Sequence, residues 1–253
     1  MEFDLSEMST GFKELKEGAE AVWAVLTDTD WGGDLPEARA EDFSLRTDIP
    51  GLEGREVIVC GRPLEEADRL DWSQGDNSYD ALGVCGINSS ANLLTQCGKE
   101  GMTEEYMVGY AIDHDWCNYG FGVEPCDAGG TTIYWQRQLI ESHGVDTKFC
   151  FAGTYGGSAE ALAARFESGR AGLINLNAGY LWDDPSCVDD GSANHAVTMT
   201  GTVRDPETGA LLGITICDSG NPNPCLFVSA EKLKLCYEQA GGSAIFTTDP
   251  VRA

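Results

Sequence analysis

The stretch GVCGINSSANLL, residues 83–94, decides how the rest of the chain is interpreted. Ile87, Ala91 and Leu94 recur at helical spacing, so the sequence predicts a helix with one buried face. Cys85 precedes this apolar stripe and is expected in the exposed first turn, where a helix offers partial positive charge and free N–H groups. Both stabilise a thiolate, the nucleophilic form of cysteine. A buried structural cysteine is the competing interpretation, and the rest of the chain must decide between them.

A histidine and an aspartate downstream are the partners that a cysteine nucleophile needs. His195 opens the apolar run 195–203, and Asp218 directly follows the apolar run 210–217. The turn-forming residues DPETG, 205–209, join the two runs, so we expect an antiparallel hairpin. Its pairing brings Asp218 near His195, where a carboxylate orients the imidazole and stabilises its charged form. Asp218 also begins a good turn sequence, and the two roles are compatible.

The remaining apolar patterns predict helices first and strands second. Helices are expected over residues 11–26, 103–112, 131–144, 158–166 and 230–237, and strands over 55–60, 171–177, 195–203, 210–217, 224–228 and 243–247. This order is typical of an α+β fold with an antiparallel sheet and not of alternating βαβ units. Residues 1–70 are expected to form an N-terminal extension, as a prosegment, a docking module or a cap, and residues 71–253 the catalytic domain.

Charge narrows the classes of partner. The chain has 253 residues, a net charge of −26 and a pI of about 4.2, which disfavours nucleic acid and anionic membrane surfaces. Basic or neutral polypeptides suit it better, although a soluble protein from an acid-biased proteome has the same composition. The first residues lack a basic region and an apolar run, so no secretory signal is expected, and no run reaches the ~20 apolar residues of a membrane span. The expected location is the cytoplasm, or outside the cell by a signal-independent route.

The other cysteines and the search for cofactor motifs provide little further information about the function. The chain has ten cysteines but no CxxC pair, so zinc ribbons and dithiol redox motifs are disfavoured. Whether Cys117, Cys126, Cys187 and Cys225 pair stays open. A zinc site of His114, Cys117 and Cys126 is disfavoured by irregular spacing. Phosphate loops, dinucleotide fingerprints and HExxH are absent from the sequence, so neither a metal nor an organic cofactor is expected.

These residues resemble the papain-like cysteine peptidases over about residues 72–253. Gln74-Gly75 followed by Gly83-x-Cys85 is similar to the family's glutamine and cysteine segments, and Asn194-His195-Ala196-Val197 is similar to its histidine strand. Asp218-Ser219 stands where many papains carry asparagine-serine. Bacterial relatives, including double-glycine leader peptidases and injected effector proteases, commonly use aspartate there. The resemblance implies a helical subdomain that carries the nucleophile helix, packed on an antiparallel β-sheet subdomain.

The resemblance also implies a role for each residue. Cys85 would attack a carbonyl carbon, His195 would hold the thiolate as an ion pair and protonate the leaving amine, and Asp218 would orient His195. The Gln74 side-chain amide and the backbone N–H of Cys85 would stabilise the oxyanion. Gln74 lies eleven residues before Cys85, farther than is usual in the family, so residues 76–82 must loop out. If they do not, Asn77 is the alternative donor.

Two features near His195 bear on the substrate. The preceding loop, residues 182–191, is acidic, and by analogy it borders the substrate cleft, where Asp183, Asp184 and Asn194 are expected to contact the substrate. A preference for basic peptides is one interpretation, and a solvated acidic loop or a calcium site is the other. Gly220 stands where the family has a tryptophan after the asparagine-serine pair, so we expect the His–Asp pair to be less shielded from water.

The proposed reaction is cleavage of a peptide bond through a thioester acyl-enzyme, with a peptide or protein as substrate. Deamidation and acyl or γ-glutamyl transfer by the same three residues are alternatives, because other nucleophiles can resolve a thioester. A catalytically silent binding module with the same fold is the alternative from another class. The oligomeric state does not follow from the sequence.

Overall fold

The computed structural model describes residues 37–39, 42–154 and 156–251, all within one compact unit, Leu35–Ala253. The strands are β1 (Phe43–Arg46), β2 (Val57–Gly61), β3 (Thr147–Phe151), β4 (Gly172–Leu176), β5 (His195–Arg204), β6 (Leu211–Asp218), β7 (Asn223–Ser229) and β8 (Ser243–Thr247). The helices are α2 (Pro63–Glu66), α3 (Cys85–Gln96), α4 (Glu104–Asp113), α5 (Ile133–Ser142), α6 (Ala159–Glu167), α7 (Ala178–Trp182) and α8 (Ala230–Leu233). A 3-10 turn covers Pro185–Cys187, and a π-helical turn covers Lys234–Gln239.

The sheet is built around β5. This strand pairs antiparallel with β6 on one edge, and with β4 and then β2 on the other. Beyond β4 the sheet continues through β8 to β3, beyond β2 it continues to β1, and β7 extends it past β6. Every one of these pairings is antiparallel. Since α3 and α6 also pack on β5, nearly all of its residues are buried and its register is well specified.

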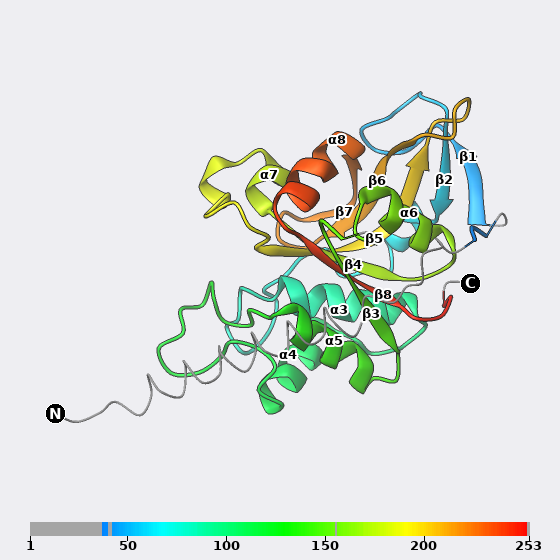
Figure 1. Ribbon diagram of the computed structural model, residues 1–253. Helices are drawn as coiled ribbons and strands as arrows, with labels where there is room; N and C mark the ends of the chain where they lie inside the picture. The colour runs from blue at the N-terminus through cyan, green and yellow to red at the C-terminus, as the bar shows by residue number, and fades with distance from the viewer. Residues whose placement is uncertain (1–36, 40–41, 155, 252–253) are drawn as a thin grey trace. The chain divides into compact units, whose positions relative to one another are not determined.

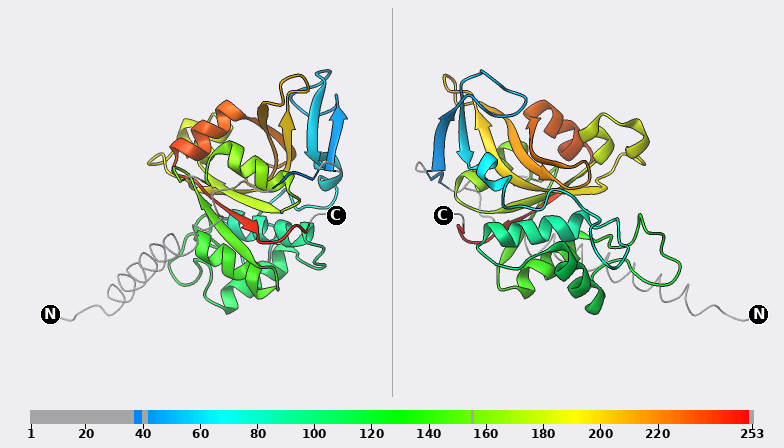
Figure 2. Two further views of the ribbon diagram at one scale, coloured as in Figure 1. Left: turned by 45° about the vertical axis from the view of Figure 1, so that its right-hand side comes forward. Right: turned by 180° about the vertical axis from the view of Figure 1, so that it is seen from behind.

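Helices cover the sheet on both faces. α3 packs on β5 and β4, with α4 and α5 beside it, while α6 contacts β5 and β6 and α8 contacts β6 and β7. Figures 1 and 2 show α3, α4 and α5 grouped on one side of the sheet, and α6, α7 and α8 toward the other. α3 is enclosed, with Ile87, Leu93 and Leu94 fully buried. Burial of a side chain of this size stabilises the fold by about 1.5–3 kcal/mol.

Side-chain caps fix where several helices begin. The hydroxyls of Thr103, Thr132, Ser158 and Ser229 accept hydrogen bonds from backbone N–H groups in the first turns of α4, α5, α6 and α8, respectively. Such caps satisfy N–H groups that have no partner inside the helix and contribute about 1 kcal/mol each. The sequence predicted helix starts at or next to three of these caps, Thr103, Ser158 and Ser229, while the cap of α5 is Thr132, one residue after the expected helix start at Thr131.

The α+β class with an antiparallel sheet, predicted from the sequence, is confirmed. The hairpin of β5 and β6 is present, and Ser243–Thr247 is a strand as predicted. The sequence analysis missed β1, α2, β3 and α7. β1 and β2 belong to the central sheet, where β2 pairs with β5. The helix expected over residues 11–26 lies outside the described residues. Among the described residues, no helix has the length and apolarity to span a bilayer.

Candidate active site

Cys85 is the first residue of α3 and is partly exposed. Val84 precedes it at the cap position and has no side-chain acceptor for the first N–H groups of the helix, which therefore remain available to an anion. The approach to the helix is fixed, because the backbone N–H of Gly83 donates to the carbonyl of Ala128 at 2.9 Å. Gly86 must be glycine, since a Cβ there would collide with Thr131 Oγ1. The thiol is thus held rigidly at a helix N-terminus.

His195 and Asp218 lie together at the end of the hairpin. His195 Nε2 is 2.8 Å from Asp218 Oδ1, and the residues are 6% and 0% exposed. The backbone N–H groups of Gly220 and Asn221 donate to the same carboxylate oxygen at 3.0 and 3.3 Å. Burial alone would raise the pKa of Asp218, but the hydrogen bond and charge of His195 lower it below its usual value. Asp218 is therefore ionised, and an ionised carboxylate requires His195 Nε2 to carry the proton.

The imidazole of His195 and the thiol of Cys85 lie close enough for each to shift the pKa of the other. Because Nε2 faces Asp218, Nδ1 is the ring nitrogen left for the sulfur. Burial favours the neutral forms of both groups, yet their mutual attraction outweighs it: the pKa of Cys85 is lowered, and hydrogen bonds to Asp218 and Cys85 raise the pKa of His195 to about 10. Backbone hydrogen bonds from Ala196 and Gly86 lower the pKa of Cys85 further. These shifts favour a thiolate–imidazolium pair.

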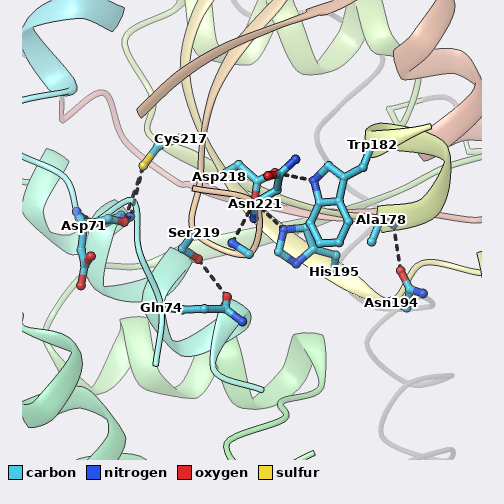
Figure 3. Close-up of polar contacts among 12 residues, drawn as sticks. Asp71, Gln74, Ala178, Trp182, Asn194, His195, Cys217, Asp218, Ser219 and Asn221 are labelled. Carbon is cyan, nitrogen blue, oxygen red and sulfur yellow. Dashed lines mark hydrogen bonds and ion pairs between the residues drawn. The ribbon is translucent and has the colours of Figure 1, made fainter. Parts of the chain in front are cut away.

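Trp182, which the sequence analysis did not assign, shields the His195–Asp218 pair. Its indole Nε1 donates to Asp218 Oδ2 at 2.7 Å, and its ring lies against His195 with centroids 5.0 Å apart (Figure 3). The expectation that this pair is less shielded from water is therefore wrong. The indole comes from the end of α7, before His195 in the chain. Gly220 leaves room for it, because a Cβ there would lie 2.6 Å from His195 Cε1 and 3.2 Å from the Trp182 ring.

Gln74 lies beside the residue that follows Asp218. Its Oε1 accepts from the hydroxyl of Ser219 at 3.1 Å (Figure 3), and its backbone N–H donates to the Ser219 carbonyl at 3.2 Å. One hydrogen of its Nε2 is used by the carbonyl of Leu82 at 2.8 Å. This bond connects Gln74 to Leu82 and so closes the loop of residues 76–82, the segment that the sequence analysis expected to loop out. The second Nε2 hydrogen has no intramolecular acceptor among the described residues.

The alternative donor, Asn77, is occupied. Its Nδ2 donates to the carbonyl of Ala81 at 2.7 Å and to Glu104 Oε1 at 2.8 Å, so both amide hydrogens are used. Glu104 also accepts from the backbone N–H of Gly75 at 2.9 Å. Asn77, which was the alternative donor only if residues 76–82 did not loop out, is therefore part of the scaffold of this loop. Glu104, nearly fully buried at the start of α4, anchors this loop. Nothing in the sequence around Thr103 indicated that Glu104 would anchor this loop.

The three residues expected to contact substrate have contacts within the loop before β5. Asn194 Oδ1 accepts from the backbone N–H of Ala178 at 2.9 Å (Figure 3), and Asn194 Nδ2 donates to the carbonyl of Cys187 at 2.9 Å. Asp183 ends α7 and pairs with Lys232 on α8. Asp184 caps the 3-10 turn by accepting from the Ser186 N–H and hydroxyl. These contacts shape the loop that carries Trp182, and both aspartates remain exposed at its surface.

The other candidate groups lie elsewhere. His114 ends α4, where its ring stacks on Tyr110 with centroids 4.1 Å apart. Cys126, Cys187 and Cys225 form no disulfide bonds in the part of the chain that the structure describes, and Cys117 is buried. Among the described residues, no group of three or more histidine, cysteine, aspartate or glutamate side chains is arranged to hold a metal ion. The zinc arrangement of His114, Cys117 and Cys126 is accordingly not formed.

Two solved structures are similar to this chain. One is a double-glycine motif protease from an AMS/PCAT transporter in complex with the leader peptide, with 16% identity and a TM-score of 0.38 over 64% of this chain and 83% of that chain. The other is described as a C39-like peptidase from Bacillus anthracis, with 19% identity and a TM-score of 0.42 over 66% of this chain and 88% of that chain. No family model and no curated protein matches the sequence.

Proposed function

We propose that the chain is a papain-like cysteine peptidase whose nucleophile is Cys85. The observation that carries the proposal is the pairing of the His195 ring with the buried Asp218 carboxylate at 2.8 Å, together with the lowering of the Cys85 pKa by the same imidazole. An imidazole held between a thiol and a buried carboxylate favours a reactive thiolate near neutral pH. A thiol that served only in packing would have no need of such partners.

In the proposed reaction, Cys85 Sγ attacks the carbonyl carbon of a peptide bond. The backbone N–H of Cys85 and the unused hydrogen of Gln74 Nε2 stabilise the oxyanion. His195 gives its Nδ1 proton to the leaving amine, which departs and leaves a thioester on Cys85. Water then attacks the thioester while His195 accepts a proton, and the thiolate is released together with the carboxylic acid product. Asp218 keeps the imidazole oriented and stabilises its positive charge through both half-reactions.

The substrate side of the proposal is a peptide that approaches the acidic loop. Asp183, Asp184, Asp189 and Asp190 are exposed on this loop, and basic side chains flanking the scissile bond would be attracted to them. Replacing all four by asparagine is expected to reduce kcat/KM for a lysine-flanked peptide and to leave that of an alanine-flanked peptide unchanged. Equal effects on the two peptides would rule out this preference.

The function is tested by comparing thiols within one chain. Brief treatment with iodoacetamide, followed by peptide mapping, is expected to label Cys85 faster than the exposed Cys126, and the excess is expected to vanish in His195→Ala. The protein and its Cys85→Ala variant are then incubated with a peptide mixture. Peptides cut only by the protein with Cys85 support the peptidase. A one-dalton gain without cutting assigns a deamidase, and labelling of Cys85 no faster than Cys126 contradicts the catalytic role altogether.

A further inference from the structure

Glu104 is a buried carboxylate in the first turn of α4, and the proposed reaction does not use it. Its two oxygens lie 2.9 and 3.1 Å from the backbone nitrogen of Gly75, which donates to them, and Oε1 also accepts from Asn77 Nδ2 at 2.8 Å. A buried charge is costly unless N–H donors replace the water around it. These donors and the positive end of α4 compensate that cost, so the charge of Glu104 is directed at the loop of residues 76–82 and at Gly75 before it.

Gly75 directly follows Gln74, so Glu104 restrains the backbone that carries the proposed oxyanion donor. The backbone N–H of Gln74 donates to the carbonyl of Ser219 at 3.2 Å, and the next N–H, that of Gly75, donates to Glu104. The φ of Gly75 is +95°, a conformation that favours glycine, and the bond to Glu104 stabilises it. Two consecutive N–H groups with fixed acceptors leave the Gln74 backbone little freedom.

Asn77 extends the same restraint to the other end of the loop. Its Nδ2 donates to the carbonyl of Ala81 at 2.7 Å, and its Oδ1 accepts from the backbone N–H of Ala81 at 3.2 Å. Ala81 precedes Leu82, whose carbonyl accepts from Gln74 Nε2 at 2.8 Å. The direction of the second Nε2 hydrogen, the one free for an oxyanion, therefore depends on where the Leu82 carbonyl is held.

We propose that Glu104 is a positioning residue, which fixes the direction of the Gln74 amide by holding the loop at both of its ends. The inference rests on the proposed function of Cys85. An oxyanion donor is effective when it already points to the place where negative charge develops. A misplacement of about 1 Å can lower a rate about 10²-fold. Glu104 acts through Gly75 and Asn77, and not by contact with the substrate.

The isosteric variant Glu104→Gln tests this role. Its amide has one acceptor oxygen where the carboxylate has two, and the new NH₂ group would face the N–H of Gly75, donor against donor. We expect kcat for a cleaved peptide to fall about tenfold, with a smaller change in KM, because the oxyanion exists only in the transition state and the intermediates.

Glu105→Gln is the matched control, with the same change at the next residue of α4. The exposed carboxylate of Glu105 accepts from the backbone N–H and the hydroxyl of Ser78, at 2.8 and 2.6 Å, midway along the segment between Gln74 and Leu82. We expect its kcat to stay within about twofold of the wild type. An equal fall of kcat in the two variants would overturn the specific role of Glu104.

A double-mutant cycle with Gln74→Ala identifies the route of the effect. Once the Gln74 amide is absent, Glu104→Gln should change kcat less than about twofold. A loss of about tenfold in both backgrounds would overturn the proposal, since Glu104 would then act independently of Gln74. Labelling of Cys85 by iodoacetamide at about pH 6 should be the same in Glu104→Gln and the wild type. A parallel loss of labelling would mean a general disturbance of the site, and would also overturn it.

Hydrogen exchange of the Gly75 amide judges the inference without a measurement of activity. We expect exchange at least about tenfold faster in Glu104→Gln and unchanged in Glu105→Gln. A wild-type chain that cuts no peptide, with the expected exchange at Gly75, would contradict the proposed function alone. Unchanged exchange at Gly75 would overturn the positioning role, whether or not peptides are cut. Thermal unfolding of each variant confirms that it is folded.

Discussion

The indole Nε1 of Trp182 donates a 2.7 Å hydrogen bond to Oδ2 of Asp218, the carboxylate whose other oxygen lies 2.8 Å from His195. Asp218 is 0% exposed, so its charge depends on these partners in place of water. The orientation of His195 is therefore fixed from two directions: through the carboxylate, and through the indole ring that lies against the imidazole. The hydrogen bond between Trp182 and Asp218 connects the end of α7 to the end of β6.

Removal of the Trp182 Nε1 donor is expected to destabilise the candidate active site without unfolding it. Trp182→Phe keeps an aromatic ring against His195 but leaves Asp218 Oδ2 without a donor, which costs about 1–3 kcal/mol of folding stability. We also expect a lower kcat, because the carboxylate is held less firmly. Chemical denaturation and peptide hydrolysis measure the two effects. Trp72→Phe, at a tryptophan that is 42% exposed, is the matched control and should change neither.

The reactivity of Cys85 should depend little on pH in the neutral range. The pKa of Cys85 is lowered and that of His195 is raised to about 10, so the ion pair persists between these two values. At about pH 6 an ordinary thiol is less than about 1% ionised, and Cys85 should react with iodoacetamide at least about tenfold faster than Cys126. In His195→Ala, the alkylation rate should instead rise steadily with pH. A wild-type profile that follows Cys126 would refute the ion pair.

Gln74 and Asn77 should respond differently to substitution. Gln74→Ala removes the proposed oxyanion donor, so we expect kcat to fall about 10²–10³-fold with little change in KM. Asn77→Ala removes four hydrogen bonds of this side chain, with Tyr79, Ala81 and Glu104, and is expected to lower stability and raise KM, with a smaller effect on kcat. Steady-state kinetics on one peptide separates the two patterns. A KM effect alone in Gln74→Ala would mean that its amide acts on substrate binding and not on the transition state.

The contribution of Asp218 to stability should be largest in a window of pH. The folded pKa of Asp218 is lowered, so its contribution is present above the unfolded value of about 3.9 and is lost as the pH falls through the folded value. The folded pKa of His195 is raised, so its contribution is present below about 6.5 and is lost as the pH rises through about 10.

The isosteric variant Asp218→Asn measures this coupling. Between the two limits we expect it to be less stable than the wild type by roughly 2 kcal/mol, the difference between a charged and a neutral hydrogen bond. The difference should shrink toward either end of the range. Urea denaturation at several pH values provides the measurement, with Asp113→Asn as the control. A difference that stayed constant from about pH 3 to pH 10 would be inconsistent with the assigned charges.

Local sequence patterns were sufficient to predict the fold class and to select Cys85, His195 and Asp218 as candidate site residues. The apolar run from His195 and the turn at residues 205–209 sufficed to predict the hairpin, because strand pairing across a short turn is a local property. Hydroxyl residues ahead of amphipathic stretches located three helix starts in the same way. Cys85 could be placed because the position of a residue at a helix N-terminus follows from its neighbours in sequence.

The features that could not be predicted from the sequence depend on contacts between segments far apart in the chain. Trp182 reaches Asp218 across thirty-six residues, and no repeat or spacing marks that pair. Asn77 was a reasonable donor by residue type, but Glu104, twenty-seven residues away, uses its amide. Gln96 could be recognised as part of α3, yet its unused oxygen became evident only once Met199 was seen to bind the nitrogen of the same amide.

The place of β8 in the sheet has a consequence for biosynthesis. Ser243–Thr247 pairs with β4 on one edge and with β3 on the other, so two strands synthesised much earlier are joined only by the last one. The sheet beneath α3 can close only after residues 243–247 have left the ribosome. A truncation before residue 243 should therefore yield an insoluble product with two exposed strand edges.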